Sequence, residues 1–172
     1  MHKILTYAGL FVVVVLLQIL LFNNLGLSVM LSPLVYIVFI LLLPLESTRL
    51  LLLAMGLLIG LVMDFGSGQA GINTIASMFI AFARPYILSA AVNKEVLSGA
   101  GIPSDIRLGG AGYWKYLITF VVLFNLVYFA FETLSLAHPM LFVGRFVVST
   151  LVGGLFVWLI ARAYVLMISR KG

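Results

Sequence analysis

The feature that most constrains this chain is a series of long apolar stretches, each close to the length needed to cross a bilayer. About 20 residues of apolar helix span the roughly 30 Å hydrocarbon core of a membrane. Six stretches approach this length, covering residues 4–22, 27–43, 49–64, 72–92, 115–137 and 140–168. The sequence therefore predicts an all-α integral membrane protein, with a single transmembrane domain (residues 1–172) of six transmembrane helices.

Composition leads to the same class of protein. Charged residues make up 9% of the chain and hydrophobic residues 64%, whereas about a quarter of the residues of a soluble domain are charged. A chain so poor in charge cannot cover its own core with a polar surface, so we expect lipid to be its solvent. The first apolar stretch is longer than a signal-peptide core, and no small-residue cleavage site follows it. We therefore interpret it as a retained helix.

The distribution of basic residues predicts the orientation. If the amino terminus is cytoplasmic, seven of the ten Lys and Arg residues fall on the cytoplasmic side: Lys3, Arg49, Lys94, Arg107, Lys115, Arg170 and Lys171. The three predicted outer loops contain none, in agreement with the positive-inside rule. We therefore expect both termini to be cytoplasmic and residues 93–112 to form a flexible, glycine-rich cytoplasmic loop. Arg162 lies about two turns from the inner end of the last helix, where we expect its side chain to snorkel.

Catalysis has few residues available in this sequence. The chain has no cysteine, and His2 and His138 are its only histidines, so neither a thiolate nucleophile nor an i, i+4 histidine metal pair can form. The glycines of residues 66–71 match the letters of the dinucleotide fingerprint, but no strand precedes them. The basic residues form no aromatic-rich patch for nucleic acid. We predict a non-enzymatic protein with no catalytic residue, cofactor, metal or nucleic-acid partner.

Small residues and a carboxylate share one face of the third predicted helix. Gly56, Gly60 and Asp64 follow one another at intervals of four residues, and a Gly-x-x-x-Gly face lets another backbone approach closely. That backbone can belong to this chain or to a partner helix, and Asp64 is either an interfacial carboxylate or a ligand contact on the outer face. The candidate partner-binding or packing face comprises Gly56, Gly60, Asp64, Gly68, Gly71 and Asn73.

Polar side chains also occur within the last three predicted helices, although an ionisable group at a helix centre costs ~2.5–3.5 kcal/mol on insertion scales. Asn73, Ser77 and Arg84 fall on one stripe, where we expect interhelical hydrogen bonds and Arg84 reaching a carbonyl or a lipid headgroup. Glu132 and Arg145 flank the predicted outer hairpin at similar depth. We expect them to form an ion pair, with a proton or ligand site as the alternative. The candidate intramembrane polar network comprises Ser77, Arg84, Asn125, Tyr128, Glu132 and Arg145.

A specific pattern appears where the third predicted helix meets the fourth. The stretch Leu58–Asp64 puts a glycine-flanked aspartate at a helix end, and Gly68, Gly71 and Asn73 lead through a glycine-rich turn into an apolar helix. This arrangement resembles the rod shape-determining MreD family. The length, the six predicted spans and the internal termini also agree with that family. Further agreement comes from Leu17–Gln18, Asn24–Leu25 and Pro33.

The resemblance implies a fold like that of the substrate-binding subunits of energy-coupling-factor transporters, and a location in the bacterial inner (cytoplasmic) membrane among membrane lipids. It also implies a scaffold of the elongasome, the machinery of rod cell shape and lateral peptidoglycan synthesis. MreD-like proteins bind an MreC-like protein, and MreB, RodA and a transpeptidase of elongation are further candidate partners. The alternative is a vitamin-binding specificity subunit of an energy-coupling-factor transporter. On the scaffold hypothesis, we expect Gly60→Leu to block assembly with the partner.

Overall fold

The computed structural model describes residues 2–22, 33–69, 71–97, 101–133 and 139–169. All regular secondary structure in these residues is helical, which confirms the predicted all-α class. The elements are α1 (His2–Leu16), the π-helix η1 (Leu17–Phe22), α2 (Val38–Leu41), α3 (Arg49–Ser67), α4 (Ile72–Ala91), α5 (Lys94–Leu97), α6 (Asp105–Leu108), α7 (Gly110–Thr133) and α8 (Pro139–Ser169).

Four of these helices, α3, α4, α7 and α8, are long and apolar enough to cross a membrane. Thr6–Leu20, in α1 and η1, forms a shorter apolar helix. Large apolar side chains cover the outward faces of the long helices, with Phe65 88% exposed and Leu151 70% exposed. Lipid can solvate such a surface, whereas water would disfavour it. The chain is therefore a membrane protein.

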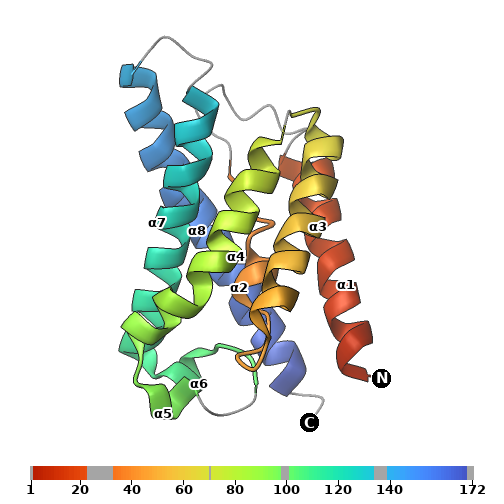
Figure 1. Ribbon diagram of the computed structural model, residues 1–172, viewed down its shortest axis with the longest axis vertical. Helices are drawn as coiled ribbons and strands as arrows, with labels where there is room; N and C mark the ends of the chain where they lie inside the picture. Colours follow the sequence, from red (N-terminus) through yellow and green to blue (C-terminus); the bar gives the residue numbers. More distant parts are fainter. Residues whose placement is uncertain (1, 23–32, 70, 98–100, 134–138, 170–172) are drawn as a thin grey trace.

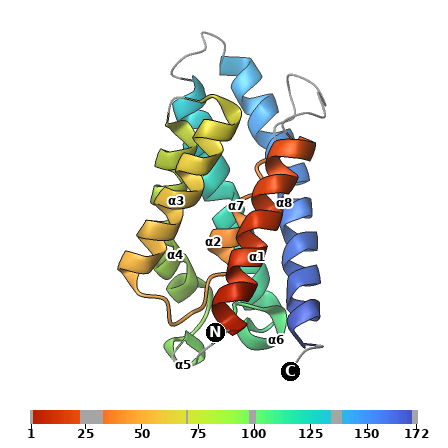
Figure 2. The same ribbon diagram turned by 90° about the vertical axis from the view of Figure 1, so that its right-hand side faces the viewer.

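The long helices run side by side along the molecule (Figures 1 and 2). α4 packs between α3 and α7, and α7 packs against α8. α1 begins and α8 ends at the same end of the bundle, which also carries α5 and α6 and is called the α5–α6 end below. The opposite end carries the turn between α3 and α4 and is called the turn end.

The prediction of a continuous helix over residues 27–43 is wrong in its described part, residues 33–43. Residues 33–37 are not helical, and only Val38–Leu41 form a single helical turn. The whole segment is buried, and α2 contacts α1, α3, α4 and α8. Hydropathy cannot distinguish such a segment from a transmembrane helix, because both are uniformly apolar. Non-helical backbone is tolerated at membrane depth only where protein surrounds it.

The remaining predicted spans agree closely with observed helices. The third extends three residues further than expected, to Ser67, and the fourth agrees to within one residue. The fifth begins at Gly110 rather than at residue 115, and the sixth covers Pro139–Ser169. Residues 134–138, which include His138 of the predicted His138–Pro139 hairpin, lie outside the described residues.

The predicted flexible loop over residues 93–112 is instead folded in its described part. It contains α5, α6 and the first turn of α7. Pro103 and Leu108 are buried, and the Leu45 N–H donates to the Gly101 carbonyl at 2.9 Å. These contacts attach the segment to the α5–α6 end of the bundle.

Candidate functional site

The small-residue face of α3 packs against α4 of the same chain. A Cβ placed on Gly60 would lie 2.5 Å from Thr74 Cα, and one on Gly56 would lie 2.9 Å from Ala81 Cβ. Both distances are well inside normal carbon–carbon contact, so only glycine permits this approach. At Gly56 and Gly60 the neighbouring backbone is therefore α4, which leaves no room there for a partner helix.

Two glycines make the reversal between α3 and α4. Gly68 ends α3 with φ 66°, and Gly71 precedes α4 with φ 88°. Both conformations lie in the left-handed region, which glycine adopts without steric cost. The tight turn brings the beginning of α4 back to the side chain of Asp64, in the last turn of α3.

Asp64 caps the amino terminus of α4. Its Oδ1 accepts from the backbone N–H and the side-chain amide of Asn73, both at 3.0 Å. Its Oδ2 accepts from the Thr74 N–H at 2.9 Å and from the Thr74 hydroxyl at 2.5 Å. The carboxylate thus satisfies two of the N–H groups that a helix start leaves without partners, and its charge complements the helix dipole.

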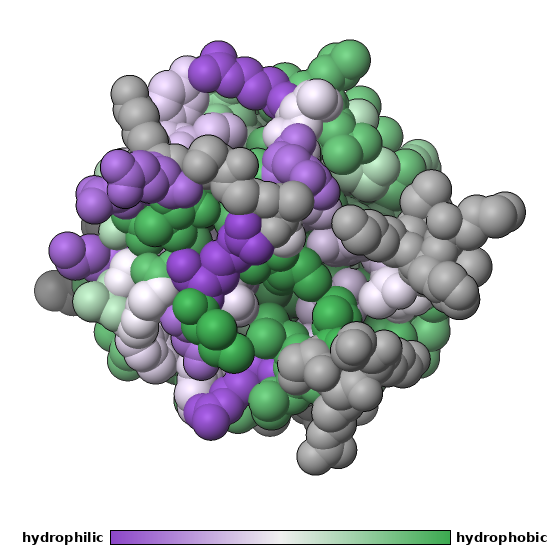
Figure 3. Space-filling model, turned by 90° about the horizontal axis from the view of Figure 1, so that it is seen from below, coloured by the Kyte–Doolittle hydropathy of each residue, from purple (hydrophilic) through white to green (hydrophobic). Residues whose placement is uncertain are grey.

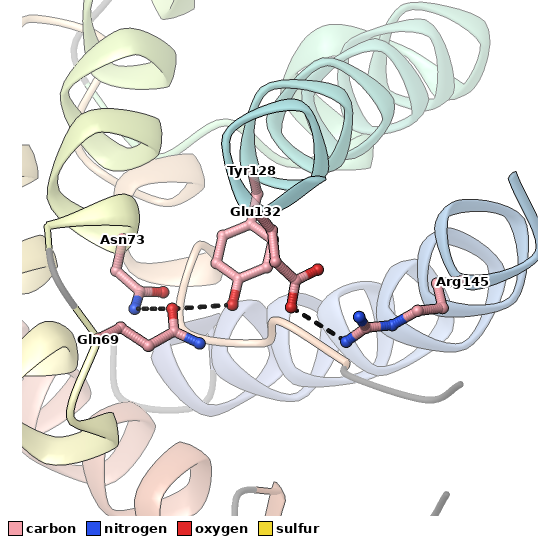
Figure 4. Close-up of polar contacts among 5 residues, drawn as sticks. All are labelled: Gln69, Asn73, Tyr128, Glu132 and Arg145. Atoms are coloured by element: carbon pink, nitrogen blue, oxygen red, sulfur yellow. Dashed lines mark hydrogen bonds and ion pairs between the residues drawn. The ribbon is translucent and has the colours of Figure 1, made fainter. Parts of the chain in front are cut away.

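Asn73 connects this cap to a layer of polar side chains across the bundle (Figure 4). The hydroxyl of Tyr36, in the buried segment, donates to Asn73 Oδ1 at 2.9 Å. The Asn73 amide donates to Gln69 Oε1 at 3.0 Å, and the Tyr128 hydroxyl of α7 donates to the same oxygen at 3.0 Å. The layer therefore joins the α3–α4 turn, the buried segment and α7.

Glu132 and Arg145 form the expected ion pair between α7 and α8. Arg145 Nη2 lies 3.0 Å from Glu132 Oε1 (Figure 4), and the two side chains are 17% and 15% exposed for Glu132 and Arg145 respectively. The guanidinium also lies over the ring of Phe129, 5.8 Å from its centroid. The pair neutralises two charges that would each be costly at membrane depth.

A charge swap tests this ion pair. Glu132→Gln and Arg145→Gln should each lower the free energy of unfolding by about 2 kcal/mol, because each leaves one charge half-buried without its partner. The double variant Glu132→Arg/Arg145→Glu should recover much of this loss. Thermal unfolding of the wild type and the three variants in one detergent measures the effect. If the loss of stability in the double variant equalled the sum of the two single losses, the ion pair would be contradicted.

Arg84 holds the carbonyl end of the buried segment. The side chain is 1% exposed, and its guanidinium donates to the carbonyls of Leu43, Leu41 and Pro44. The expectation that Arg84 reaches a carbonyl is thus confirmed. The last carbonyls of a helical turn have no internal partner, and here a cation from α4 supplies one.

Tyr116 of α7 completes this group. Arg84 Nε donates to the Tyr116 hydroxyl at 3.1 Å, and that hydroxyl donates to the Leu41 carbonyl at 2.9 Å. Two helices, α4 and α7, therefore fix the carbonyl end of a single helical turn.

Gln18 holds the other end of the buried segment. Its Oε1 accepts from the N–H groups of Val35 and Tyr36 at 2.8 and 3.3 Å, and its Nε2 donates to the Pro33 carbonyl at 3.2 Å. In the sequence Gln18 belongs to the family pattern, and nothing around it predicts this role. An amide inside an otherwise apolar helix is the signal that could have identified it.

The remaining residues of the predicted polar network do not join one site. The Asn125 amide donates to the Val121 carbonyl of its own helix at 2.9 Å, and Ser77 is buried against Gly56 at the α3–α4 contact. The structure thus separates the Arg84 group from the Asn73–Tyr128 layer and from the Glu132–Arg145 pair. Gln69, Tyr36, Tyr116 and Thr74 are the contributors that the sequence did not indicate.

A shallow depression of about 550 Å³ opens at the turn end beside Phe65. It is lined by Leu61, Asp64, Phe65, Gly68, Gln69, Gly71, Thr74 and Ile75. Most of its surface is apolar, and the exposed faces of α3 and α4 form it. Asp64, Gly68 and Gly71, which belong to the pattern of the family resemblance, therefore line one open surface feature.

Comparison with known proteins adds no assignment. No protein-family model matches the chain. No curated protein and no solved structure matches it either.

The polar groups described above bind backbone groups and one another. Both oxygens of Asp64 are occupied by donors from α4, so a role as a base or a metal ligand would break the cap. Among the described residues, no group of three His, Asp or Glu side chains is placed to hold a metal ion.

Proposed function

We propose that this protein is a non-enzymatic membrane scaffold of the bacterial cell-elongation machinery, a member of the MreD family that binds an MreC-like partner. MreB, RodA and a transpeptidase of elongation are the further partners that this assignment implies. The proposal is supported by the sequence pattern from Leu58 to Asn73 and by the contacts that the residues of this pattern make. The pattern builds an α3–α4 turn capped by Asp64, beside which Phe65 is exposed.

The depression beside Phe65 carries the proposal. Asp64, Gly68 and Gly71 contribute to its wall, and Phe65 is 88% exposed next to it. A large aromatic side chain beside an apolar hollow is the kind of anchor from which interfaces derive most of their binding energy. We propose that the transmembrane segment of the MreC-like protein packs here.

Six crossings of the inner membrane, with both termini cytoplasmic, complete the proposal. Four long helices account for four crossings, and α1 with η1 for a fifth. The buried segment of residues 33–43 leads toward the α5–α6 end, where α3 begins (Figure 1), and would complete the second crossing without a regular helix. This path supports a six-crossing bundle like the transporter subunits that the resemblance implies.

Gentle affinity purification of the tagged protein from its own membranes, followed by mass spectrometry, tests the function. Recovery of an MreC-like protein with RodA or MreB is the expected result. Recovery of paired ATPase subunits with a coupling membrane protein would instead identify a transporter subunit and overturn the scaffold proposal.

The variant Phe65→Ala tests the position of the interface. Removing a central aromatic anchor typically costs about 2 kcal/mol or more, so we expect the recovered MreC-like protein to fall at least about tenfold. Phe82→Ala is the matched control. Like Phe65, Phe82 is exposed (54%), but it belongs to α4 and does not line the depression. Equal recovery with both variants would place the interface elsewhere.

One observation favours the rival function, a vitamin-binding transporter subunit. Glu132 Oε2 and Arg145 Nε are buried, and neither has a hydrogen-bond partner among the described residues. A polar ligand at the turn end could satisfy both atoms. Thermal stabilisation of the purified protein by one member of a vitamin panel would support this reading, since a ligand bound only to the folded state raises its stability.

A further inference from the structure

Two tryptophans and an arginine meet on the outside of α7 and α8, away from every group discussed above. The rings of Trp114 and Trp158 stack with centroids 5.8 Å apart and planes 25° apart. The guanidinium of Arg162 lies over the Trp158 ring, 5.4 Å from its centroid. Trp114 and Arg162 are exposed, and Trp158 is half-buried.

The stacking fixes the level of this group along the helix bundle. Trp114 lies four residues, or about 6 Å, from the beginning of α7. Because Trp158 stacks on it, and because α8 runs antiparallel to α7, Arg162 lies one turn further toward the α5–α6 end, level with the first residues of α7. Tryptophans gather at the interfacial level where lipid headgroups begin, and Trp114 lies close to the first residue of the candidate membrane span Gly110–Glu132.

Within the described part of the chain, Arg162 forms no salt bridge with an acidic side chain. The salt bridge seen there joins Arg145 to Glu132. Lys115 adds a second exposed cation next to Trp114. Toward the membrane centre the surface is apolar, with Ile118 and Leu155 exposed. Hydrophilic side chains gather on the end face itself (Figure 3).

We propose that this cluster is a binding site for an anionic phospholipid. The phosphate binds Arg162 and the tryptophan pair supports the glycerol region. The acyl chains lie along Ile118 and Leu155. An unpaired cation held on an aromatic platform at headgroup depth complements a negatively charged headgroup. A zwitterionic lipid offers the same acyl chains without the net charge, so the site should select lipids by headgroup.

Tryptophan fluorescence measures which lipid contacts the cluster, because Trp114 and Trp158 are the only tryptophans in the chain. The full-length protein is reconstituted in phosphatidylcholine vesicles that contain either brominated phosphatidylglycerol or brominated phosphatidylcholine at equal mole fraction. Bromine quenches only tryptophans that it contacts. We expect quenching to show an about fivefold preference for phosphatidylglycerol, the ratio that one cation near an anionic surface supplies.

Three variants separate a site from general electrostatic attraction. Arg162→Gln should lower the preference to about one, while Arg162→Lys should retain most of it. Arg49→Gln is the matched control, because Arg49 is also exposed at the α5–α6 end and also lies over an aromatic ring, that of Tyr86 at 5.7 Å. An unchanged preference in Arg162→Gln, or an equal loss in Arg49→Gln, would overturn the proposal.

Discussion

Replacing Arg84 by leucine is expected to remove a large part of the protein's stability. Among the described residues the guanidinium is the sole donor to the Leu43 carbonyl, and it adds hydrogen bonds to the carbonyls of Leu41 and Pro44, which also accept from the Tyr116 hydroxyl and the Ser47 N–H. A buried acceptor left without a donor costs about 1–3 kcal/mol, and the shorter leucine also leaves a cavity, so the total loss should be about 3 kcal/mol. That is a large part of the roughly 5–15 kcal/mol that stabilises a typical domain.

The measurement is the amount of monodisperse protein extracted from membranes, together with its unfolding temperature in detergent. Arg84→Leu should accumulate poorly and melt far below the wild type. Arg84→Lys should be intermediate, because it keeps a positive charge and donors but loses the planar fork. Arg49→Leu removes an exposed arginine and should behave as the wild type. An Arg84→Leu protein as stable as the control would mean that the buried segment is held by other contacts.

The four long helices could be predicted from sequence, whereas the buried segment could not. A hydropathy pattern reports whether residues avoid water, and this is the same for a lipid-facing helix as for residues 33–43. What makes the segment irregular is distant in sequence. Gln18 lies 15 to 18 residues before the groups it binds, and Arg84 lies about 40 residues after its carbonyls. No local window contains both partners.

The site shows the same division between near and distant partners. Glu132 and Arg145 could be paired from sequence because a short hairpin places residues on antiparallel helices at predictable depths. For Asp64 the sequence predicts only a glycine-flanked carboxylate near the end of a helix. Its role as the cap of α4 depends on the reversal at Gly68 and Gly71, which brings Asn73 and Thr74 within 3.0 Å.

The buried polar side chains described above share a physical task. Inside a membrane, each irregular stretch of backbone must have its N–H and C=O groups satisfied by protein. Gln18 and Arg84 do this for the two ends of the buried segment, and Asp64 does it for the beginning of α4. The exposed side chains of Phe65 and Arg162 take no part in this task.

Gly60→Ala is expected to destabilise the protein strongly, and Gly60→Leu to prevent its folding. The added Cβ would lie 2.5 Å from Thr74 Cα, a backbone atom that can yield only if α4 moves. Overpacking in a core usually costs about 1–3 kcal/mol, and here a shift of Thr74 would also disturb its two hydrogen bonds to Asp64. We therefore expect about 3 kcal/mol for alanine and more for leucine.

Gly144→Ala is the matched control, because Gly144 is also helical but a Cβ there would meet nothing within 4 Å. That variant should be as stable as the wild type or slightly more stable, since alanine favours helix over glycine. Thermal unfolding of the three proteins in detergent gives the comparison. The result also separates folding from assembly. Gly60→Ala should lose the partner only in proportion to the lost folded protein, whereas Phe65→Ala should lose the partner with the fold intact. If Gly60→Ala protein melted as the wild type but no longer bound the partner, the glycine face would belong to the interface after all.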